Sequence, residues 1–250
     1  MRRFVVLAAV IAVAAAAAIP GGAQSTGLTA AQILDKTDEA VNGPKDQSYT
    51  VHLMLIDSDG KEKTREEIML QKGRDKRLVR FESPADQRGI AFLSLPGDVQ
   101  YLYLPAFGKV RRIASSVRNT SFGGTDFTYE DLETTRWSEK WNAAIARTEE
   151  GAIVLELTPR PGKDSSYSRL LIWATKESFY PVRIESYDKN GSLAKILVRE
   201  QLQKVSGYWV SMVTTMEDVR KHHKTRMTVS DVTFDTGISD DKFTERSLSH

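Results

Sequence analysis

Cysteine is absent from the 250 residues of the sequence. Without thiols the chain cannot form a disulfide bond, a thiolate zinc site, a cysteine nucleophile or the lipid-modified cysteine that anchors bacterial lipoproteins. Histidine is also scarce, with four residues in the chain. His222 and His223 are neighbours that would point to opposite faces of a strand, so we interpret them as part of a polar hairpin turn and expect no metal site.

The sequence also lacks the motifs of the common enzyme classes. It contains no G-x-S-x-G nucleophile elbow, no H-E-x-x-H helix, no phosphate-binding loop and no dinucleotide fingerprint. The formal net charge is +2 and falls to zero without Arg2 and Arg3, which gives no indication of a nucleic-acid partner. We therefore expect a protein that is not an enzyme, with no catalytic residues and no cofactor.

The first residues have the pattern of a secretory signal peptide. Arg2 and Arg3 precede an apolar run over 4–18, and the small and helix-breaking residues Pro20 to Ala23 follow it. This order of charge, apolar core and small residues predicts cleavage after Ala23. An uncleaved membrane anchor is the alternative, but the apolar run is short for a bilayer and ends at helix breakers. We predict a signal peptide over 1–23 and one domain over 24–250, located in the periplasm without a lipid anchor.

One amphipathic helix is predicted before the strands, over 29–41. Thr29 and Gln32 form a capping box at its start, and Asn-Gly-Pro at 42–44 stops it. Its apolar face repeats at helical spacing. That face comprises Ala30, Ile33, Leu34, Thr37, Ala40 and Val41. We expect the helix to plug one end of a barrel or to cover a sheet, with Ile33, Leu34 and Val41 as plug residues.

From residue 48 the hydrophobic period changes to two, which is typical of strands. Turn residues such as Asp59-Gly60, Asn190-Gly191 and Gly207 separate the runs and indicate an antiparallel meander. The expected strands are 48–57, 62–71, 76–82, 89–95, 98–104, 108–113, 143–149, 152–159, 168–175, 181–188, 193–204, 208–219 and 223–234.

Between the two groups of strands, 126–132 predicts a short helix opened by a glycine pair and capped by Thr125 or Asp126. Phe127 and Tyr129 are its predicted lid residues. An acidic cluster surrounds them: Asp126, Glu130, Asp131 and Glu133. We interpret the cluster as favourable charge at a helix start rather than as a calcium site or an acid/base pair.

A dozen or so strands with two or three helical segments cannot stay a flat sheet, because long twisted sheets curl or close. We therefore predict a mainly β (α+β) fold: a strongly curved antiparallel sheet that forms a half-open β-barrel with a helical plug or lid. A barrel this wide exceeds what side chains fill, and the apolar positions include several methionines, so a ligand cavity is predicted, with a filled core as the alternative. The predicted cavity residues are Leu53, Leu55, Phe92, Leu95, Tyr101, Tyr103 and Trp173.

Basic residues at 109–113 have two interpretations. Lys109, Arg111 and Arg112 would contact anionic head groups, or they would protect a sheet edge from pairing with other chains.

Several segments taken together resemble the outer-membrane lipoprotein-sorting protein family, relatives of the periplasmic carrier LolA. In the first half these are YLYLP at 101–105, KVRRI at 109–113 and SFGGTDFTYEDL at 121–132. In the second half they are YPVRIE at 180–185, DKNG at 188–191, GYW at 207–209 and DKFTERSL at 241–248. The similarity covers nearly the whole mature chain.

The resemblance implies a half-open barrel around an apolar cavity with a helical plug or lid, as in LolA and LolB. It further implies a periplasmic carrier for a lipid or lipoprotein acyl chain, in transient contact with membranes. An inner-membrane exporter, of the resistance-nodulation-division class, and an outer-membrane acceptor are the implied partners. The alternative is an envelope sensor or protein-binding module on the same fold. A third possibility is hydrolysis of an envelope lipid, but the sequence shows no nucleophile and base for it.

Overall fold

The computed structural model describes residues 27–134 and 136–249. The predicted signal peptide lies outside the described residues. All thirteen expected strands occur, with ends within two residues of those expected. They are β1 (Asp46–Ile56), β2 (Glu62–Lys72), β3 (Lys76–Ser83), β4 (Ala91–Leu95), β5 (Val99–Leu104), β6 (Lys109–Arg112), β7 (Trp141–Thr148), β8 (Ala152–Pro159), β9 (Arg169–Thr175), β10 (Pro181–Tyr187), β11 (Leu193–Val205), β12 (Tyr208–Asp218) and β13 (His223–Phe234).

The strands form one antiparallel sheet with the order β6-β5-β4-β3-β2-β1-β13-β12-β11-β10-β9-β8-β7. The first and last strands pair at its centre, where Leu53 lies opposite Met227. The outermost strands β6 and β7 follow one another in sequence yet stand at opposite edges. The sheet is therefore curved but not closed, and the chain between β6 and β7 has to cross from one edge to the other.

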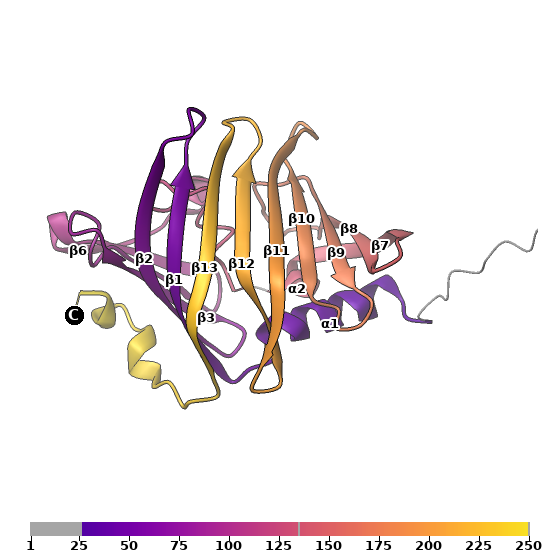
Figure 1. Ribbon diagram of the computed structural model, residues 1–250, viewed down its shortest axis with the longest axis horizontal. Helices are drawn as coiled ribbons and strands as arrows, with labels where there is room; N and C mark the ends of the chain where they lie inside the picture. The colour runs from indigo at the N-terminus through magenta and orange to yellow at the C-terminus, as the bar shows by residue number, and fades with distance from the viewer. Residues whose placement is uncertain (1–26, 135, 250) are drawn as a thin grey trace, which may run out of the picture.

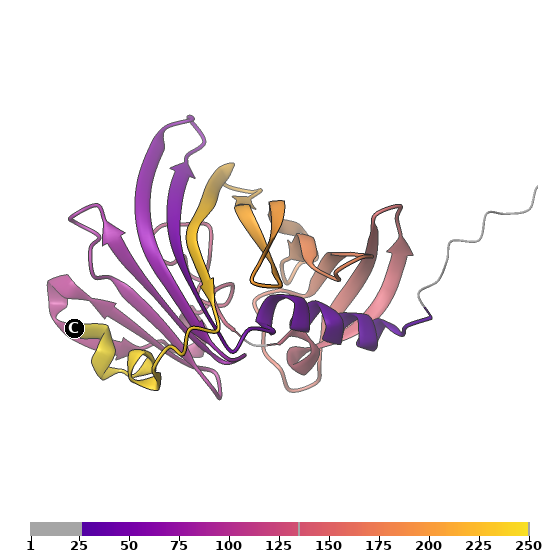
Figure 2. The same cartoon turned by 60° about the horizontal axis from the view of Figure 1, so that its bottom comes forward.

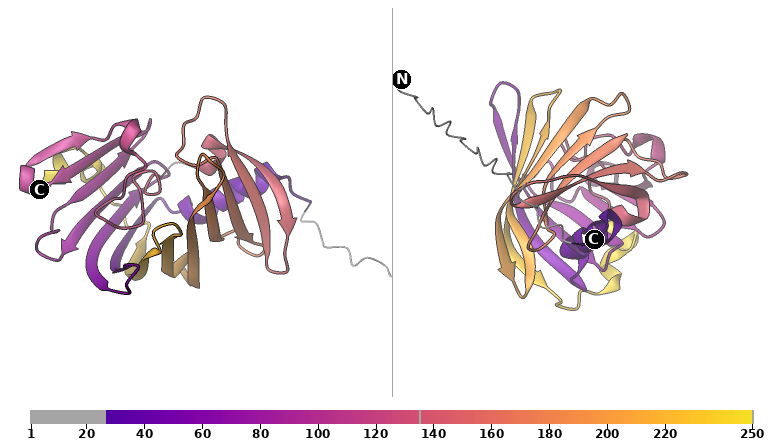
Figure 3. Two further views of the ribbon diagram at one scale, coloured as in Figure 1. Left: turned by 90° about the horizontal axis from the view of Figure 1, so that it is seen from above. Right: turned by 90° about the vertical axis from the view of Figure 1, so that its right-hand side faces the viewer.

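Figure 1 shows the long central strands β1, β13 and β12, with β2–β6 on one side and β7–β11 on the other. Turning the molecule shows that the two halves bend toward each other around a concave face (Figure 2). Figure 3 shows the same trough from above and along its length. The fold is the curved, half-open barrel that the sequence predicts.

Helix α1 (Ala30–Asn42) lies across the concave face, in contact with β7, β12 and the short helix α2 (Trp137–Lys140). The predicted capping box is present: the Gln32 backbone N–H donates to the Thr29 hydroxyl, and the Gln32 side chain accepts from the Thr29 backbone N–H. Ile33 and Leu34 are buried in the core. The helix therefore covers the sheet with the face that the sequence identifies.

The sheet has apolar layers on both faces. The concave face carries the main core, and its strands contribute residues at alternate positions, such as Val79 and Phe81 of β3. The opposite face of β3–β5 carries a second cluster, which contains Leu78, Ala91 and Leu93. The C-terminal 3-10 helices η3 (Asp240–Phe243) and η4 (Arg246–Ser249) cover it with Phe243 and Leu248. This second layer explains why β4 is apolar on both faces.

The predicted helix over 126–132 is wrong, because this stretch is a sequence of turns. Ser121 and Thr128 form an isolated antiparallel bridge around a tight turn. Gly123 and Gly124 occupy the left-handed region in that turn, with φ of 57° and 78°. The Asp131 carboxylate accepts the Thr128 backbone N–H at 2.8 Å. Positive-φ residues and side-chain-to-backbone bonds of this kind favour turns over a helix.

Candidate functional site

Residues 121–134, here called the covering segment, fill the concave face between the two halves of the sheet. Phe122 stacks on Phe81 of β3, with ring centroids 5.1 Å apart. Tyr129 stacks on Phe92 of β4 at 5.8 Å. Phe127 is also buried in the main core. The apolar side chains of the covering segment thus occupy the inside of the half-barrel.

Gly123 lies where only glycine fits. A Cβ on this residue would lie 2.6 Å from Cε2 of Phe81. The Arg65 guanidinium stacks over the Phe81 ring at 5.3 Å and donates to the Gly123 carbonyl. The glycine therefore allows the backbone to lie directly on an aromatic ring, which brings the covering segment into van der Waals contact with the sheet.

Polar contacts fix the covering segment to β11 and β13. The Lys195 ammonium of β11 donates to the Asp126 carbonyl and to the Asp131 carboxylate, both at 2.6 Å. Thr225 of β13 donates to the Asp126 carboxylate at 2.7 Å, and His223 Nδ1 lies 2.7 Å from the same group. The interpretation of the acidic cluster as a helix start is therefore wrong, because these carboxylates bind the covering segment to the sheet.

The rest of the acidic cluster acts in the same way. Glu130 accepts the Ser166 backbone N–H at 2.8 Å, from the β8–β9 connection. Asp131 accepts the Tyr167 hydroxyl at 2.8 Å. Glu133 is paired with Lys140 of α2. Each acidic side chain thus has a donor from a different part of the chain.

A chain of hydrogen bonds joins α1 to the covering segment through the sheet. Gln71 of β2 donates to the Asn42 side chain at 2.9 Å and accepts from Arg77 of β3 at 2.6 Å. Arg77 in turn donates to the Leu132 carbonyl at 3.1 Å. The C-terminal end of α1 and the end of the covering segment are therefore held by one network.

Helix α1 is also fixed to α2. The buried Asp38 carboxylate accepts the backbone N–H groups of Trp137 and Ser138, each at 2.9 Å. Burial raises the pKa of Asp38, although these hydrogen bonds and the charge of Arg136 oppose the rise. Helices α1 and α2 are thus joined through the carboxylate of Asp38.

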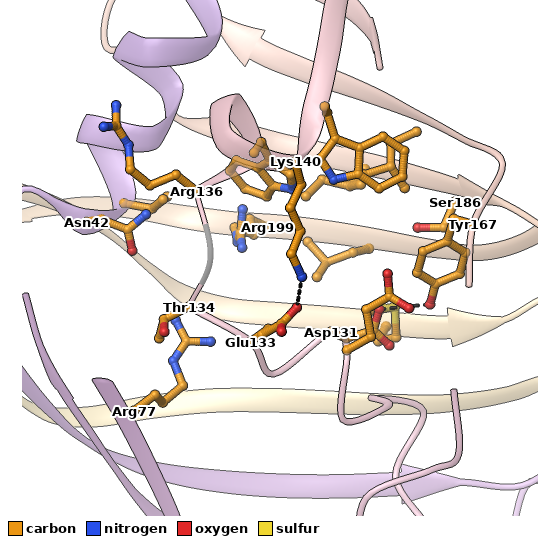
Figure 4. A pocket seen from close by; sticks show the side chains of 18 residues that line it. Asn42, Arg77, Asp131, Glu133, Thr134, Arg136, Lys140, Tyr167, Ser186 and Arg199 are labelled. Carbon is orange, nitrogen blue, oxygen red and sulfur yellow. Dashed lines mark hydrogen bonds and ion pairs between the residues drawn. The ribbon is translucent and has the colours of Figure 1, made fainter. Parts of the chain in front are cut away.

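A cavity of about 170 Å³ remains between α1, α2, the covering segment and the sheet (Figure 4). One part of its wall is apolar and comprises Val41, Trp137, Trp141, Leu170, Ile184, Leu197 and Met216. The other part is polar and comprises Asn42, Arg77, Glu130, Asp131, Glu133, Thr134, Arg136, Lys140, Tyr167, Ser186 and Arg199. The cavity is amphipathic rather than purely apolar.

The size of the cavity decides what it holds in this conformation. A dry cavity of roughly 150 Å³ accepts a ring the size of benzene, whereas pockets for drug-sized ligands start near 300 Å³. At about 170 Å³ the cavity has room for a small group and not for a long acyl chain. The expected hollow interior is therefore mostly filled, because α1 and the covering segment occupy the trough.

The predicted cavity residues are divided between the two faces of the sheet. Leu53, Leu55 and Phe92 lie in the main core on the concave face. Leu95, Tyr101 and Tyr103 pack against the second cluster on the other face. Trp173 also points outward, with its indole N–H 3.2 Å from Glu149. None of the seven lines the cavity of Figure 4.

Of the predicted plug and lid residues, Ile33, Leu34, Phe127 and Tyr129 are buried in the main core. Val41 lines the cavity.

The charged residues of the concave face were not predicted from the sequence. Arg77 precedes Val79 and Phe81 at alternate positions of β3, and Arg199 follows Leu197 on β11. Alternation with apolar residues therefore placed both arginines on the inner face. In a sequence, a charged residue in a strand usually indicates the solvent-exposed face. The alternation of Arg77 and Arg199 with apolar residues is therefore only a weak indication that they face inward.

Burial shifts the pKa values of several inner groups. Burial lowers the pKa of Arg77 to about 10, and the charge of Arg199 adds to the effect while Tyr49 opposes it. Burial also raises the pKa of Glu67 to about 8, against the opposing charge of Arg65. Glu67 lies between Val51 and Phe81 in the sheet register. At neutral pH Arg77 remains charged, whereas Glu67 is mostly protonated.

Solved structures with the same fold include three that cover 88% of this chain. A domain from Vibrio parahaemolyticus described as an outer membrane lipoprotein-sorting protein is 29% identical, with a TM-score of 0.80 over 98% of its length. A DUF1329 family protein from Desulfovibrio piger is 27% identical, with a TM-score of 0.83 over 97% of its length. A LolA superfamily protein from Nitrosomonas europaea is 22% identical, with a TM-score of 0.75 over 100% of its length.

A family model with the description "-like: Uncharacterized protein" matches residues 73–250. None of the curated protein sequences matches the chain. In the part of the chain that the structure describes, no helix has the length and hydropathy needed to cross a membrane.

Proposed function

We propose that this chain, which belongs to the LolA-like outer-membrane lipoprotein-sorting proteins, is a periplasmic carrier for a lipid or lipoprotein acyl chain. The family model that matches residues 73–250 and the solved structures of the same fold are the basis for this premise. The proposal gives the protein a binding role rather than a catalytic one. The observation that carries it is the concave apolar face of a half-open barrel, closed by a segment that polar contacts fix in place.

Physical chemistry explains why a carrier needs such a face. A sixteen-carbon chain costs roughly 13 kcal/mol to expose to water, at about 0.8 kcal/mol per methylene. A carrier must therefore enclose nearly the whole chain. The inner sides of β1, β4 and β8 supply apolar residues for this purpose, among them Leu53, Phe92 and Leu155.

Binding a long chain inside the half-barrel requires the covering segment to move, because the cavity between α1, α2 and this segment is too small. The anchors at Lys195, Asp126 and Asp131 are polar, so water can replace them when the segment moves, at a net cost of about 1.5–3 kcal/mol for each bond to a charged group. The aromatic residues that leave the trough, Phe122 and Tyr129, would be replaced there by the acyl chain. Lid movements of this kind gate many enclosed sites.

The edge near β6 has the properties of a membrane-contact surface. Residues 99–125 contain no acidic side chain, and Lys109, Arg111 and Arg112 are exposed there. Phe107 at the β5–β6 turn is 62% exposed, with Arg111 stacked 5.6 Å from its ring. Cations beside an exposed aromatic residue favour a surface of anionic lipids. We infer that this edge makes the transient contact through which cargo enters or leaves.

An inner-membrane exporter of the resistance-nodulation-division class is the donor that we propose, with an outer-membrane protein or leaflet as acceptor. A carrier whose cargo costs this much to expose needs direct transfer at both ends.

The carrier function is tested by native mass spectrometry of the protein purified from membrane-containing cells, together with uptake of a fluorescent fatty acid. We expect lipid adducts and saturable uptake. A protein that is repeatedly free of lipid and takes up no fatty acid would contradict the proposal.

A further inference from the structure

The cavity contains two arginines that no carboxylate neutralises. Within residues 27–134 and 136–249, neither Arg77 nor Arg199 forms an ion pair with an acidic side chain. The other two cations of the wall are paired, Arg136 with Asp35 at 3.3 Å and Lys140 with Glu133. Both residues are partly buried, and a cation that has lost part of its hydration gains from a partner of opposite charge.

None of the three carboxylates in the wall is paired with Arg77 or Arg199, and each is bound by other groups. Asp131 is paired with Lys195 at 2.6 Å, and Glu133 with Lys140. Glu130 accepts from Ser166. The positive charge of the arginine pair is therefore left for a group from outside the chain.

Both guanidinium groups keep unused donors. Arg77 donates through Nε and Nη2 to Gln71 and through Nη1 to the Leu132 carbonyl. One N–H on each of its terminal nitrogens remains free for another acceptor. Arg199 donates through Nη1 to the Pro181 carbonyl at 2.9 Å, and its other N–H groups have no acceptor among the described residues. The guanidinium fork suits a planar or tetrahedral anion with two or more oxygens.

The arginines adjoin the apolar part of the same wall. On β11 Arg199 lies two residues from Leu197 on the same face, and Leu197 is paired with Ile184 of β10 and Met216 of β12. These three apolar side chains line the cavity together with Arg199, which is labelled in Figure 4. The arrangement matches a molecule with an anionic end and an apolar chain.

We propose that Arg77 and Arg199 form a binding site for the anionic oxygens of an amphiphile, a carboxylate or a phosphate at the end of an apolar chain. The inference rests on the proposed carrier function and narrows its cargo to anionic lipids. The cavity of about 170 Å³ is large enough for the anionic group, and the chain of the ligand takes the place of the covering segment.

The test compares two probes of equal chain length, decanoate and decanol, with inorganic phosphate as an anion without a chain. Binding is followed by displacement of the neutral dye N-phenyl-1-naphthylamine. Arg77→Gln and Arg199→Gln each remove one cation, and Arg226→Gln, on the exposed side of β13, is the matched control. Arg77 also donates a hydrogen bond to the Leu132 carbonyl of the covering segment, whereas Arg199 does not. The Arg199→Gln variant therefore tests the anion site without loosening the covering segment.

We expect the wild type to bind decanoate more tightly than decanol. Each inner substitution should weaken decanoate roughly 10- to 100-fold, because a charge-assisted hydrogen bond is lost, and leave decanol within about two-fold. The Arg226 variant should behave as the wild type.

Equal affinity of the wild type for decanoate and decanol would overturn the anionic site while leaving the carrier function standing. Phosphate binding as tight as that of decanoate would also overturn it, in favour of a small-anion site. Failure to bind either ten-carbon probe would contradict the carrier function itself.

Discussion

Arg77 of β3 and Arg199 of β11 line the same cavity although five strand spacings separate their strands in the sheet. In a flat sheet this separation would be about 24 Å, at roughly 4.8 Å per strand. Here the charge of Arg199 contributes to lowering the pKa of Arg77, with burial as the larger cause. The curvature of the sheet thus creates a cationic site from residues that are distant both in sequence and along the sheet.

Locking the covering segment should abolish lipid uptake. The Asp126 backbone N–H lies 2.9 Å from the Thr225 hydroxyl, and the two side chains are also hydrogen-bonded. This closeness suits a disulfide in the variant Asp126→Cys with Thr225→Cys, in a chain that has no other thiol. Uptake of a fluorescent fatty acid should be lost in the oxidised form and return on reduction, so the reduced variant is its own control. Full uptake by the oxidised form would show that the segment does not gate binding.

Loosening the covering segment should have the opposite effect. In Gly123→Ala the new methyl group meets the Phe81 ring at 2.6 Å, whereas in Gly124→Ala the nearest atom is 3.6 Å away. Both glycines have positive φ, so backbone strain is common to the two variants. We expect Gly123→Ala to lower the free energy of unfolding by about 1–3 kcal/mol more than the control, as overpacking does, and to increase binding of a hydrophobic dye. Urea titrations that give the two variants the same stability would contradict the packing argument.

The free energy of unfolding should fall as the pH rises, because the buried Glu67 carboxyl ionises more readily in the unfolded chain. Burial raises its pKa to about 8 in the folded protein, above the ordinary value near 4.5. The folded state therefore binds more protons than the unfolded state between these values, and unfolding becomes easier as pH increases through that window.

Glu67→Gln should remove this dependence. We expect no difference from the wild type below pH 4.5, and a gain on the order of 3 kcal/mol at pH 7, measured by urea unfolding. Glu62→Gln, at an exposed position of the same strand, is the control. A gain for Glu67→Gln that is constant with pH would mean that ionisation of Glu67 does not cause it.

Removing the cations near β6 should weaken membrane contact. The triple variant Lys109→Gln, Arg111→Gln, Arg112→Gln should bind vesicles of anionic phospholipid roughly 100-fold more weakly, since each cation contributes about 1 kcal/mol at such a surface. The control removes three exposed lysines elsewhere, at Lys63, Lys163 and Lys189. Vesicle co-sedimentation at low and high salt measures both. Equal loss in the two triple variants would indicate attraction by overall charge, without a defined surface.

The strands and α1 were predictable because their signals are local. Each strand shows a period of two between turn residues, and His223–Phe234 matches the expected range. The start of α1 depends on Thr29 and Gln32, three residues apart, which form the capping box. Curvature followed from the number of strands and the few helices available to cover them.

Residues 121–134 show where local signals fail. Their short acidic and aromatic pattern resembles the start of a helix, but the conformation depends on partners far away in the chain. Lys195 lies 64 positions from Asp131, and Thr225 lies 99 positions from Asp126. A turn held by such contacts has no periodicity of its own, so the local sequence does not distinguish it from a short helix.

The sequence by itself determined the thirteen strands, α1 and the family, because hydrophobic period, turn residues and motifs act over a few neighbouring positions. The pairing of β1 with β13, which places β6 and β7 at opposite edges, came only from the tertiary structure. Only the tertiary structure decided which face of each strand looks inward, and it placed Phe92 inside and Tyr101 outside. The reason is that both faces of β4 and β5 bury apolar residues, so alternation alone does not distinguish them. Sheet curvature then decided that Arg77 and Arg199 share one cavity.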